Sequence, residues 1–237
     1  MSALLKIDGL SGGYVRGEDN EVLHDITMAI DMGEVVGVIG KNGSGKSTLA
    51  KAIMNLLPYR SGEIHFEGKD VSKKSTHELA GLGIALMHQG GTVFPNLSIW
   101  QNLELAWGKD YDEDYRHQLE GMVPLLSRTK SSLQQTKADR LSGGERLELA
   151  LTMALARRPK LAILDEPGAG LSPKSLMETY NRLAQIRDTF GMAMMIIEQN
   201  IARAHQSCDR CLVLDLGKIT ANLDRNTTFE TIESLMF

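Results

Sequence analysis

The sequence predicts an α/β fold with a mixed sheet core, an antiparallel β layer near the N-terminus and a helical insertion at about residues 90–145. The apolar run at 35–39 leads through a glycine-rich loop into a helical pattern. Two further apolar runs, at 161–164 and 192–197, end in acidic or amide side chains. Short continuous apolar runs are typical of parallel strands that helices cover on both faces.

The first predicted element is an antiparallel strand that ends near residue 33. Apolar side chains occupy every second position of this segment, at Ile26, Met28, Ile30 and Met32. A period of two is typical of a strand with one buried face, so all four are expected to face the core. Asn20 and its charged neighbours indicate a hairpin turn before this strand.

A helix and further strands are predicted after the glycine-rich loop. Apolar residues recur at helical spacing from Leu49 to Leu56, and Pro58 ends the predicted helix. The dipeptides at 61–62 and 68–69 are expected to be turns on either side of a short alternating strand. Residues 84–87 are expected to form a short apolar strand that ends at His88-Gln89.

Helices and the later strands are predicted for the rest of the chain. A capping box at Ser98–Gln101 starts a helical stretch that runs to about Asp139, and the next helix spans Glu145–Arg157. A further helix begins after Ser172, has Pro173 at its first position and ends at Gly191. The apolar residues after Cys211 indicate a strand, and a final short helix is expected to complete the chain.

Composition limits the functions open to this chain. Its 237 residues are 42% hydrophobic, enough for one large domain with a substantial core. A net charge of -4 without a basic block argues against a nucleic-acid partner. The sequence has no run of about 18 apolar residues and no secretory leader, so we expect it neither to span a membrane nor to be exported.

The two cysteines, Cys208 and Cys211, form a lone C-x-x-C. A redox pair or half of a zinc site is one interpretation of this spacing. Zinc needs two more nearby ligands, which the sequence does not offer, and Cys211 opens an apolar strand rather than a helix. We therefore expect two small core residues and a reducing cytosol.

Residues 40–47, Gly-Lys-Asn-Gly-Ser-Gly-Lys-Ser, carry the most informative motif. Its three glycines allow the backbone N–H groups to turn around a phosphate chain, and the following helix adds the positive end of its dipole. Lys46 supplies a charge for the β- and γ-phosphates, and Ser47 a hydroxyl for Mg²⁺. The alternative is an ordinary glycine turn, but the Lys-Ser ending and the flanking elements argue against it.

Polar residues follow several of the other predicted strands. Asp165 is suited to hold Mg²⁺, usually through water, and the adjacent Glu166 to polarise an attacking water. Gln89 and Gln199 also stand at strand ends. Ligands of open α/β sheets bind at the carboxyl ends of the strands, so we expect these side chains to converge with the loop at 40–47.

A second phosphate site is predicted at Leu141–Glu145, Leu-Ser-Gly-Gly-Glu. The Ser142 hydroxyl, two glycine N–H groups and the start of a helix together favour an anion. One γ-phosphate does not need two such sites from the same chain, so two chains placed head to tail would each bring one to the other's nucleotide. The alternative is an ordinary glycine-containing helix start.

With these motifs the chain resembles the ATP-binding cassette (ABC) ATPase subunits, which are P-loop NTPases, over nearly its whole length. Residues 40–47 resemble the Walker A element, 141–145 the family signature and 165–166 the Walker B pair. Gln89 stands where the Q-loop glutamine belongs, and residues 170–172 where the D-loop belongs.

The resemblance implies a RecA-like core at about 1–89 and 146–237 and a helical subdomain at about 90–145. It also implies roles for individual residues. Tyr14 would stack on the adenine of ATP. The loop residues expected to bind ATP are Gly40, Lys41, Asn42, Gly43, Ser44, Gly45, Lys46, Ser47 and Thr48. The residues expected to bind the partner's ATP are Ser142, Gly143, Gly144 and Glu145. Those expected at Mg²⁺ are Ser47, Gln89 and Asp165. Those expected in catalysis are Glu166, as the general base, Gln199 and Gln89.

Three residues depart from the commonest pattern of the family. Glu145 replaces the signature glutamine, Ser172 the D-loop aspartate and Gln199 the switch histidine. A glutamine cannot titrate near neutral pH, although it can hydrogen-bond the γ-phosphate or the attacking water. A histidine-assisted mechanism is therefore in doubt, and Glu166 carries more of the chemistry.

The segments at 94–98, 170–173 and 198–200 are similar to ATPase subunits of branched-chain amino acid importers and of related urea and amide importers. This resemblance implies a second ABC ATPase as partner, either the same or a related chain. It also implies membrane permease subunits that dock near 89–100 and the insertion, and indirectly a solute-binding protein. The chain would lie at the cytoplasmic face of a bacterial inner membrane. Trp100 and Trp107 either belong to the permease contact or pack the insertion.

Two other functions remain open. ATPases of lipid or polysaccharide exporters are also separate chains, but they more often keep the switch histidine. A soluble assembly ATPase of similar length is the alternative from another class. The sequence does not reveal the transported solute, because the ATPase does not touch it.

Overall fold

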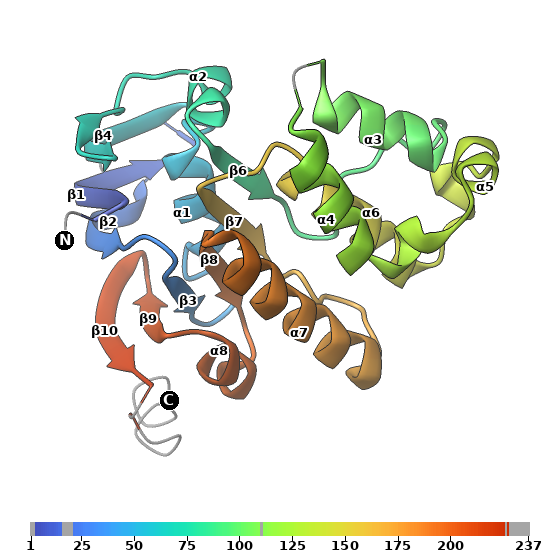
Figure 1. Ribbon diagram of the computed structural model, residues 1–237. Helices are drawn as coiled ribbons and strands as arrows, with labels where there is room; N and C mark the ends of the chain where they lie inside the picture. Colours follow the sequence, from blue (N-terminus) through green and yellow to red (C-terminus); the bar gives the residue numbers. More distant parts are fainter. Residues whose placement is uncertain (1–2, 16–20, 110, 226, 228–237) are drawn as a thin grey trace.

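The computed structural model describes residues 3–15, 21–109, 111–225 and 227, and their strands form two sheets (Figure 1). The four-stranded sheet is antiparallel in the order β2-β1-β4-β5. The six-stranded sheet has the order β10-β9-β3-β8-β7-β6, and only its edge strand β10 is antiparallel to its neighbour. This arrangement confirms the predicted α/β class, its mixed sheet core and its antiparallel layer.

The strands are β1 (Leu5–Gly13), β2 (Glu21–Ile30), β3 (Val35–Ile39), β4 (Tyr59–Phe66), β5 (Lys69–Asp70), β6 (Ile84–Met87), β7 (Leu161–Asp165), β8 (Ala193–Glu198), β9 (Arg210–Asp215) and β10 (Lys218–Asp224). The helices are α1 (Lys46–Ile53), α2 (Thr76–Gly81), α3 (Ile99–Trp107), α4 (Glu113–Met122), α5 (Lys130–Gln135), α6 (Gly143–Leu155), α7 (Pro173–Phe190) and α8 (Ile201–Ser207), with short 3₁₀ helices at Pro124–Ser127 and Ala138–Arg140. In the described ranges, no helix is both long and apolar enough to cross a bilayer.

Two hydrophobic clusters cover the two faces of the six-stranded sheet. Alternate residues of β3 divide between them: Val36 and Val38 pack with α1 and the antiparallel sheet, whereas Val35 and Ile39 pack with α6, α7 and α8. Because successive strand side chains point to opposite faces, a fully apolar strand is expected where both faces are covered. The protein is therefore built in layers. The antiparallel sheet and α1 cover one face of the main sheet, and an outer set of helices covers the other.

The helices α3, α4 and α5 gather beyond β6, at one side of the main sheet (Figure 1). A third hydrophobic cluster, which includes Leu103, Trp107 and Leu133, holds most of this region together. Helix α6 joins this cluster through Leu149 and the sheet-side cluster through Leu151. Since α6 is shared, the predicted boundaries of a helical subdomain at about 90 and 145 stay a prediction.

Three local predictions were wrong. Met32 does not face the core: it lies in the turn after β2 and is 63% exposed. The helix α1 ends at Ile53, so Leu56 lies outside it on the surface. Residues 61–62 are not a turn, because β4 runs through them and Gly62 passes close to the backbone of β1 with a φ of 89°. A side chain could not fit in this approach, so the glycine marks a close strand contact.

Two further predictions, the hairpin turn at Asn20 and the final short helix, lie outside the described residues.

Both cysteines are buried and their thiols are free, as expected of core residues. They pack against Gly37, in the middle of β3.

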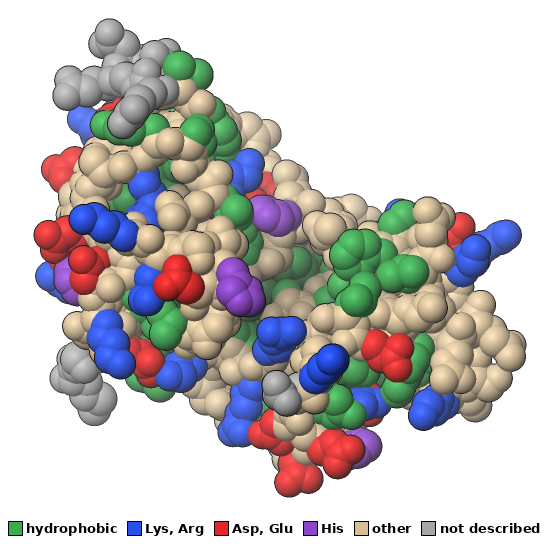
Figure 2. Space-filling model, turned by 90° about the horizontal axis from the view of Figure 1, so that it is seen from above, with side chains coloured by type: hydrophobic (Ala, Val, Ile, Leu, Met, Phe, Trp, Pro, Cys, Tyr) green, Lys and Arg blue, Asp and Glu red, His purple; other side chains and the backbone are tan. Residues whose placement is uncertain are grey.

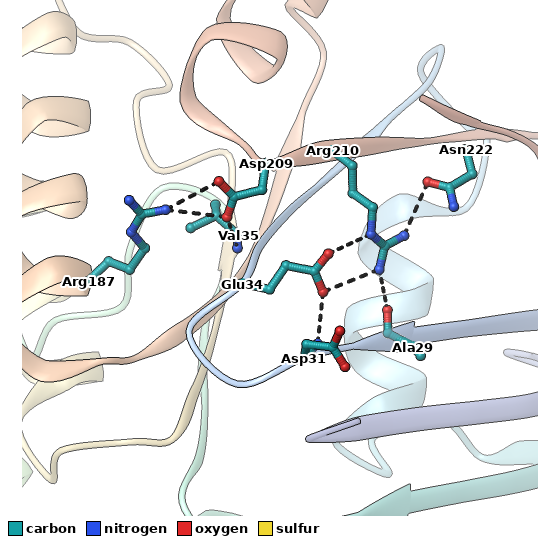
Figure 3. A network of polar contacts seen from close by, with 8 residues as sticks. All are labelled: Ala29, Asp31, Glu34, Val35, Arg187, Asp209, Arg210 and Asn222. Carbon is teal, nitrogen blue, oxygen red and sulfur yellow. Dashed lines mark hydrogen bonds and ion pairs between the residues drawn. The ribbon is translucent and has the colours of Figure 1, made fainter. Parts of the chain in front are cut away.

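A network of polar contacts fixes the start of β3 (Figure 3). Asp209 accepts a hydrogen bond from the Val35 N–H at 2.9 Å and pairs with Arg187 of α7. The neighbouring Arg210 pairs with Glu34 at 2.6 Å and donates to the carbonyl of Ala29 in β2. These contacts tie β9 to the antiparallel sheet and to the strand that precedes the glycine-rich loop.

Candidate functional site

The sheet order brings the predicted polar residues to one edge. Strands β3, β8, β7 and β6 are parallel neighbours, so their carboxyl ends lie side by side. A cavity of about 480 Å³ opens at this edge. It is lined by Val22, Asn42, Gly43, Gly45, Lys46, Ser47, Thr48, Gln89, Glu166 and Gln199. The convergence expected from the strand ends is therefore observed.

The loop at 40–47 wraps the start of α1. Gly45, the residue before the helix, has a φ of 105°, a conformation that favours glycine over residues with side chains. The Lys46 ammonium donates to the carbonyls of Gly40 and Lys41 at 2.8 and 2.9 Å. The lysine thus holds the two ends of the loop together.

Burial lowers the pKa of Lys46, while the nearby carboxylates Glu166 and Asp165 act in the opposite direction. The side chain of Ser44 is buried in the same loop, and its hydroxyl has no partner among the described residues. A buried cation and an unpaired hydroxyl leave donors ready for an anionic ligand.

Asp165, the last residue of β7, has the features of a metal ligand. Its side chain is buried, and its Oδ1 atom has no hydrogen-bond partner in the described structure. Burial raises the pKa of this carboxyl, while a hydrogen bond with Ser47 lowers it. The oxygens of Ser47, Asp165 and Gln89 form the hard donor set that Mg²⁺ prefers, so the residues present fit that ion.

Glu166 lies at the centre of the site between two amides. Gln89, beyond the end of β6, donates through Nε2 to Glu166 Oε2 at 2.6 Å. Gln199, beyond the end of β8, donates through Nε2 to Glu166 Oε1. Strand β7 lies between β6 and β8, which explains why one amide reaches each carboxylate oxygen.

The backbone of Glu166 is also unusual, with a φ of 49° outside the range that non-glycine residues commonly adopt. Its N–H donates to the carbonyl of Ile197 in β8 at 3.0 Å. Strained backbone held by neighbouring strands is concentrated at functional sites. Hydrogen bonds therefore hold Glu166 through both its backbone and its side chain.

Tyr14 lies beside the phosphate loop, with 49% of its surface exposed. Its hydroxyl is 3.3 Å from the Thr48 hydroxyl and accepts a hydrogen bond from Lys51 at 3.2 Å. Lys51 also lies over the tyrosine ring, 5.2 Å from its centroid. The structure thus leaves an exposed aromatic face next to α1, and its role in stacking on adenine stays a prediction.

The sequence analysis missed several residues of this site. Val22 of β2 lines the cavity, His88 lies near enough to influence the pKa of Asp165, and Lys51 contacts Tyr14. None of them belongs to a motif. His88 stands at the same strand end as Gln89, so that strand end could have indicated it. No local pattern indicates Val22 or Lys51, because only the folded arrangement places them there.

The corner at Ser142–Glu145 begins α6 away from this cavity. Among the described residues, the cavity lining includes none of these four. Ser142 and Glu145 form a reciprocal capping box, with the Ser142 hydroxyl donating to Glu145 Oε2 at 2.8 Å. These hydrogen bonds, aided by the nearby Arg128 guanidinium, lower the pKa of the Glu145 carboxyl. A hypothetical Cβ on Gly143 would meet nothing within 4 Å, so its backbone is open to a ligand.

A strand, a phosphate loop and a helix beside an Asp-Glu pair define a P-loop nucleotide-binding protein. The family model for the ABC transporter matches residues 23–169, more than half of the chain. The chain therefore belongs to the ABC transporter family, and it is an ATPase subunit of a transporter. ATP is its nucleotide.

Named relatives cover nearly the whole chain. The probable branched-chain amino acid transport ATP-binding protein LivF of Archaeoglobus fulgidus is 32% identical over 227 residues, which are 96% of this chain and 94% of that protein. The high-affinity branched-chain amino acid transport ATP-binding protein BraG of Pseudomonas aeruginosa is 34% identical over 199 residues, 84% of each. The lipopolysaccharide export system ATP-binding protein LptB of Escherichia coli K12 is 30% identical over 222 residues, 93% of this chain and 90% of that protein.

Solved structures share the fold. The cbiO1 protein of Clostridium perfringens, described as part of the ABC transporter complex cbiONQ, superposes with a TM-score of 0.80 at 25% identity. The match covers 99% of this chain and 94% of that one. This likeness supports the layered arrangement of two sheets and an outer helical region.

Proposed function

We propose that this chain energises a membrane importer of branched-chain or other hydrophobic amino acids, as one of two ATPase subunits that pair head to tail. ATP and Mg²⁺ would bind at the cavity beside residues 40–47. Glu166 would accept the proton of the attacking water, with Gln89 and Gln199 holding the carboxylate and water in place. The names of the relatives LivF and BraG support the solute class.

The observation that carries the paired arrangement is the separation of the two phosphate sites. The cavity is lined by residues of the loop at 40–47 and by Gln89, Glu166 and Gln199, but by no residue from Ser142–Glu145 among those described. That corner has an open glycine and a helix start, features that favour an anion. A second cassette, either a copy of this chain or a related one, would bring its own such corner to this cavity.

A hollow between the sheet core and the outer helices offers a place for the permease (Figure 2). It has a volume of about 570 Å³ and a largely apolar lining that includes Met87, Phe94, Leu105 and Met153. Leu105 is 57% exposed, and Phe94 is also exposed. Exposed apolar patches commonly mark interaction sites. His88 and Thr92, which lie on either side of Gln89 in the sequence, line this hollow. A docked permease helix would therefore lie next to a residue that contacts Glu166.

The experiment is recovery of the tagged chain from detergent-solubilised membranes, with its partners identified by mass spectrometry. We expect permease subunits and a solute-binding protein whose purified form binds leucine, isoleucine or valine. Leu105→Asp should lose the permease, while the matched control Met177→Asp, an exposed apolar residue of α7, should retain it. Retention by both variants would place the docking surface elsewhere.

Other partners would identify other functions. A membrane complex without a solute-binding protein would favour an exporter, a function that the similarity to LptB also supports. A solute-binding protein specific for urea or a short amide would change the solute and leave the mechanism as proposed. Recovery with no membrane protein at all would contradict transport and favour a soluble assembly ATPase.

A further inference from the structure

A buried carboxylate lies directly behind Gln199. Glu198 ends β8 and is 2% exposed. Its Oε1 atom accepts a hydrogen bond from the Tyr180 hydroxyl, and both of its oxygens accept from Arg203 Nη1 at 3.1 Å. Burying a charge is costly unless it is paired and hydrogen-bonded, and this carboxylate meets both conditions.

The partners of Glu198 come from both sides of the turn that carries Gln199. Tyr180 belongs to α7 and Arg203 to α8, so the carboxylate joins three elements. The next residue but one, Asn200, donates its N–H to Glu198 Oε2 at 3.4 Å and caps α8 by accepting from the Arg203 N–H at 2.9 Å. Gln199 therefore stands between two residues whose positions are fixed.

This anchoring matters because Gln199 is a flexible amide. Its described side-chain hydrogen bond is the one to Glu166. A glutamine cannot change its charge, so its contribution depends on the direction in which its N–H group and oxygen point. Its side chain turns about several single bonds, and a fixed backbone limits where the amide can reach. Small displacements of a positioning group are costly in catalysis.

We propose that Glu198 is a positioning residue for ATP hydrolysis: held by Tyr180 and Arg203, it fixes the turn that directs the Gln199 amide onto Glu166. The inference rests on the roles proposed above for Glu166 and Gln199. Glu198 does not line the nucleotide cavity, whereas Gln199 does. Glu198 therefore acts through its neighbour and does not touch the nucleotide.

The test is Tyr180→Phe, which keeps the ring and removes one hydrogen bond to Glu198. We expect kcat for ATP to fall by about three- to tenfold and KM to stay within about twofold, because the geometry of hydrolysis changes and the phosphate loop does not. In a Gln199→Ala background, Tyr180→Phe should change kcat by less than about twofold, since the residue it positions is gone.

Tyr115→Phe provides the matched control. Tyr115 is a buried tyrosine of the same hydrophobic cluster, and its hydroxyl donates to the carbonyl of Leu155 at 2.7 Å, far from Gln199 in the chain. A purely structural effect would lower the melting temperature of both variants and change kcat equally in both. We expect loss of kcat for Tyr180→Phe alone.

If Gln199→Ala lowers kcat, three results would overturn the positioning role of Glu198. They are an unchanged kcat for Tyr180→Phe, an equal loss in Tyr115→Phe, and a full additional loss in the Gln199→Ala background. An unchanged kcat for Gln199→Ala itself would instead contradict the proposed role of Gln199. A second variant, Glu198→Gln, should reproduce the loss of kcat if it folds, because a neutral amide leaves Arg203 unpaired.

Discussion

At the scale of single residues, the site is organised around one carboxylate. Glu166 has a donor on each oxygen and an unusual backbone conformation. Both donors are amides, so they hold the carboxylate without neutralising it. Each oxygen of Glu166 keeps a second lone pair, to which a water can donate while both amides stay in place. Gln89 is the amide suited to turn toward Mg²⁺, because its oxygen belongs to the proposed metal set.

Replacing Glu166 by glutamine tests the proposed base. Glu166→Gln should slow ATP hydrolysis by about 10²–10⁴-fold, the usual contribution of a general base, while ATP binding stays intact. Turnover and ATP affinity of the purified chain are the measurements. Glu178→Gln, on the exposed side of α7, is the control and should hydrolyse ATP normally. Hydrolysis by Glu166→Gln at the parental rate would show that another group is the base.

Replacing Lys46 tests the phosphate loop. Lys46→Ala removes a buried positive charge that now contacts only loop carbonyls in the described hydrogen bonds. A hydrogen bond to a charged group contributes about 1.5–3 kcal/mol, so ATP affinity should fall by about 10- to 100-fold. A titration with a nucleotide measures the loss, and Lys174→Ala on α7 is the matched control. Parental affinity in Lys46→Ala would contradict contact with the phosphates.

At the scale of elements, the long periodic segments were predictable and the short ones were not. The core strands β3, β7 and β8 are continuous apolar runs, and Pro173 and Gly191 mark both ends of α7. The helices α2 and α8 were missed. Each is only six or seven residues long and buries one residue, too little for a visible stripe.

The residues of the site also divide into those that the sequence predicts and those that only the folded structure reveals. Glycines, Lys46 and the Asp-Glu pair stand in fixed local patterns, so the sequence could place them. The edge to which β6, β7 and β8 bring Gln89, Glu166 and Gln199 follows from strand order. The pairing of Glu198 with Tyr180 and Arg203 depends on how α7 and α8 pack on the sheet, and no local pattern predicts it.

The charge of Glu145, at the start of α6, contributes to stability in a way that can be tested. Hydrogen bonds from Ser142 lower the pKa of Glu145 below its ordinary value of 4.5, with help from Arg128. Its contribution to stability is therefore present above pH 4.5 and is lost as pH falls through the lowered pKa.

Glu145→Gln, which removes the charge and keeps the length of the side chain, should remove this dependence. The parental melting temperature should exceed that of Glu145→Gln at neutral pH, and the difference should shrink as the pH falls below 4.5. Thermal unfolding over this range checks it, with Glu178→Gln as the control. A difference that stays constant or grows on acidification would contradict the assigned contacts.

At the scale of the whole molecule, we propose that the chain provides two parts of a nucleotide site that only a second cassette completes. One part is the cavity beside residues 40–47, and the other is the corner at Ser142–Gly144 at the start of α6. The apolar hollow that includes Phe94 and Leu105 lies between the core and the helical region. Docking of a permease there would act on the same junction that positions Gln89, which offers a physical route from transport to hydrolysis.

The most direct test is the structure of Glu166→Gln with ATP and Mg²⁺ bound. We predict a head-to-tail pair in which the Ser142 hydroxyl and the N–H groups of Gly143 and Gly144 bind the γ-phosphate held by the opposite subunit. A complex in which this corner faces solvent, with each ATP enclosed by one chain alone, would contradict the account.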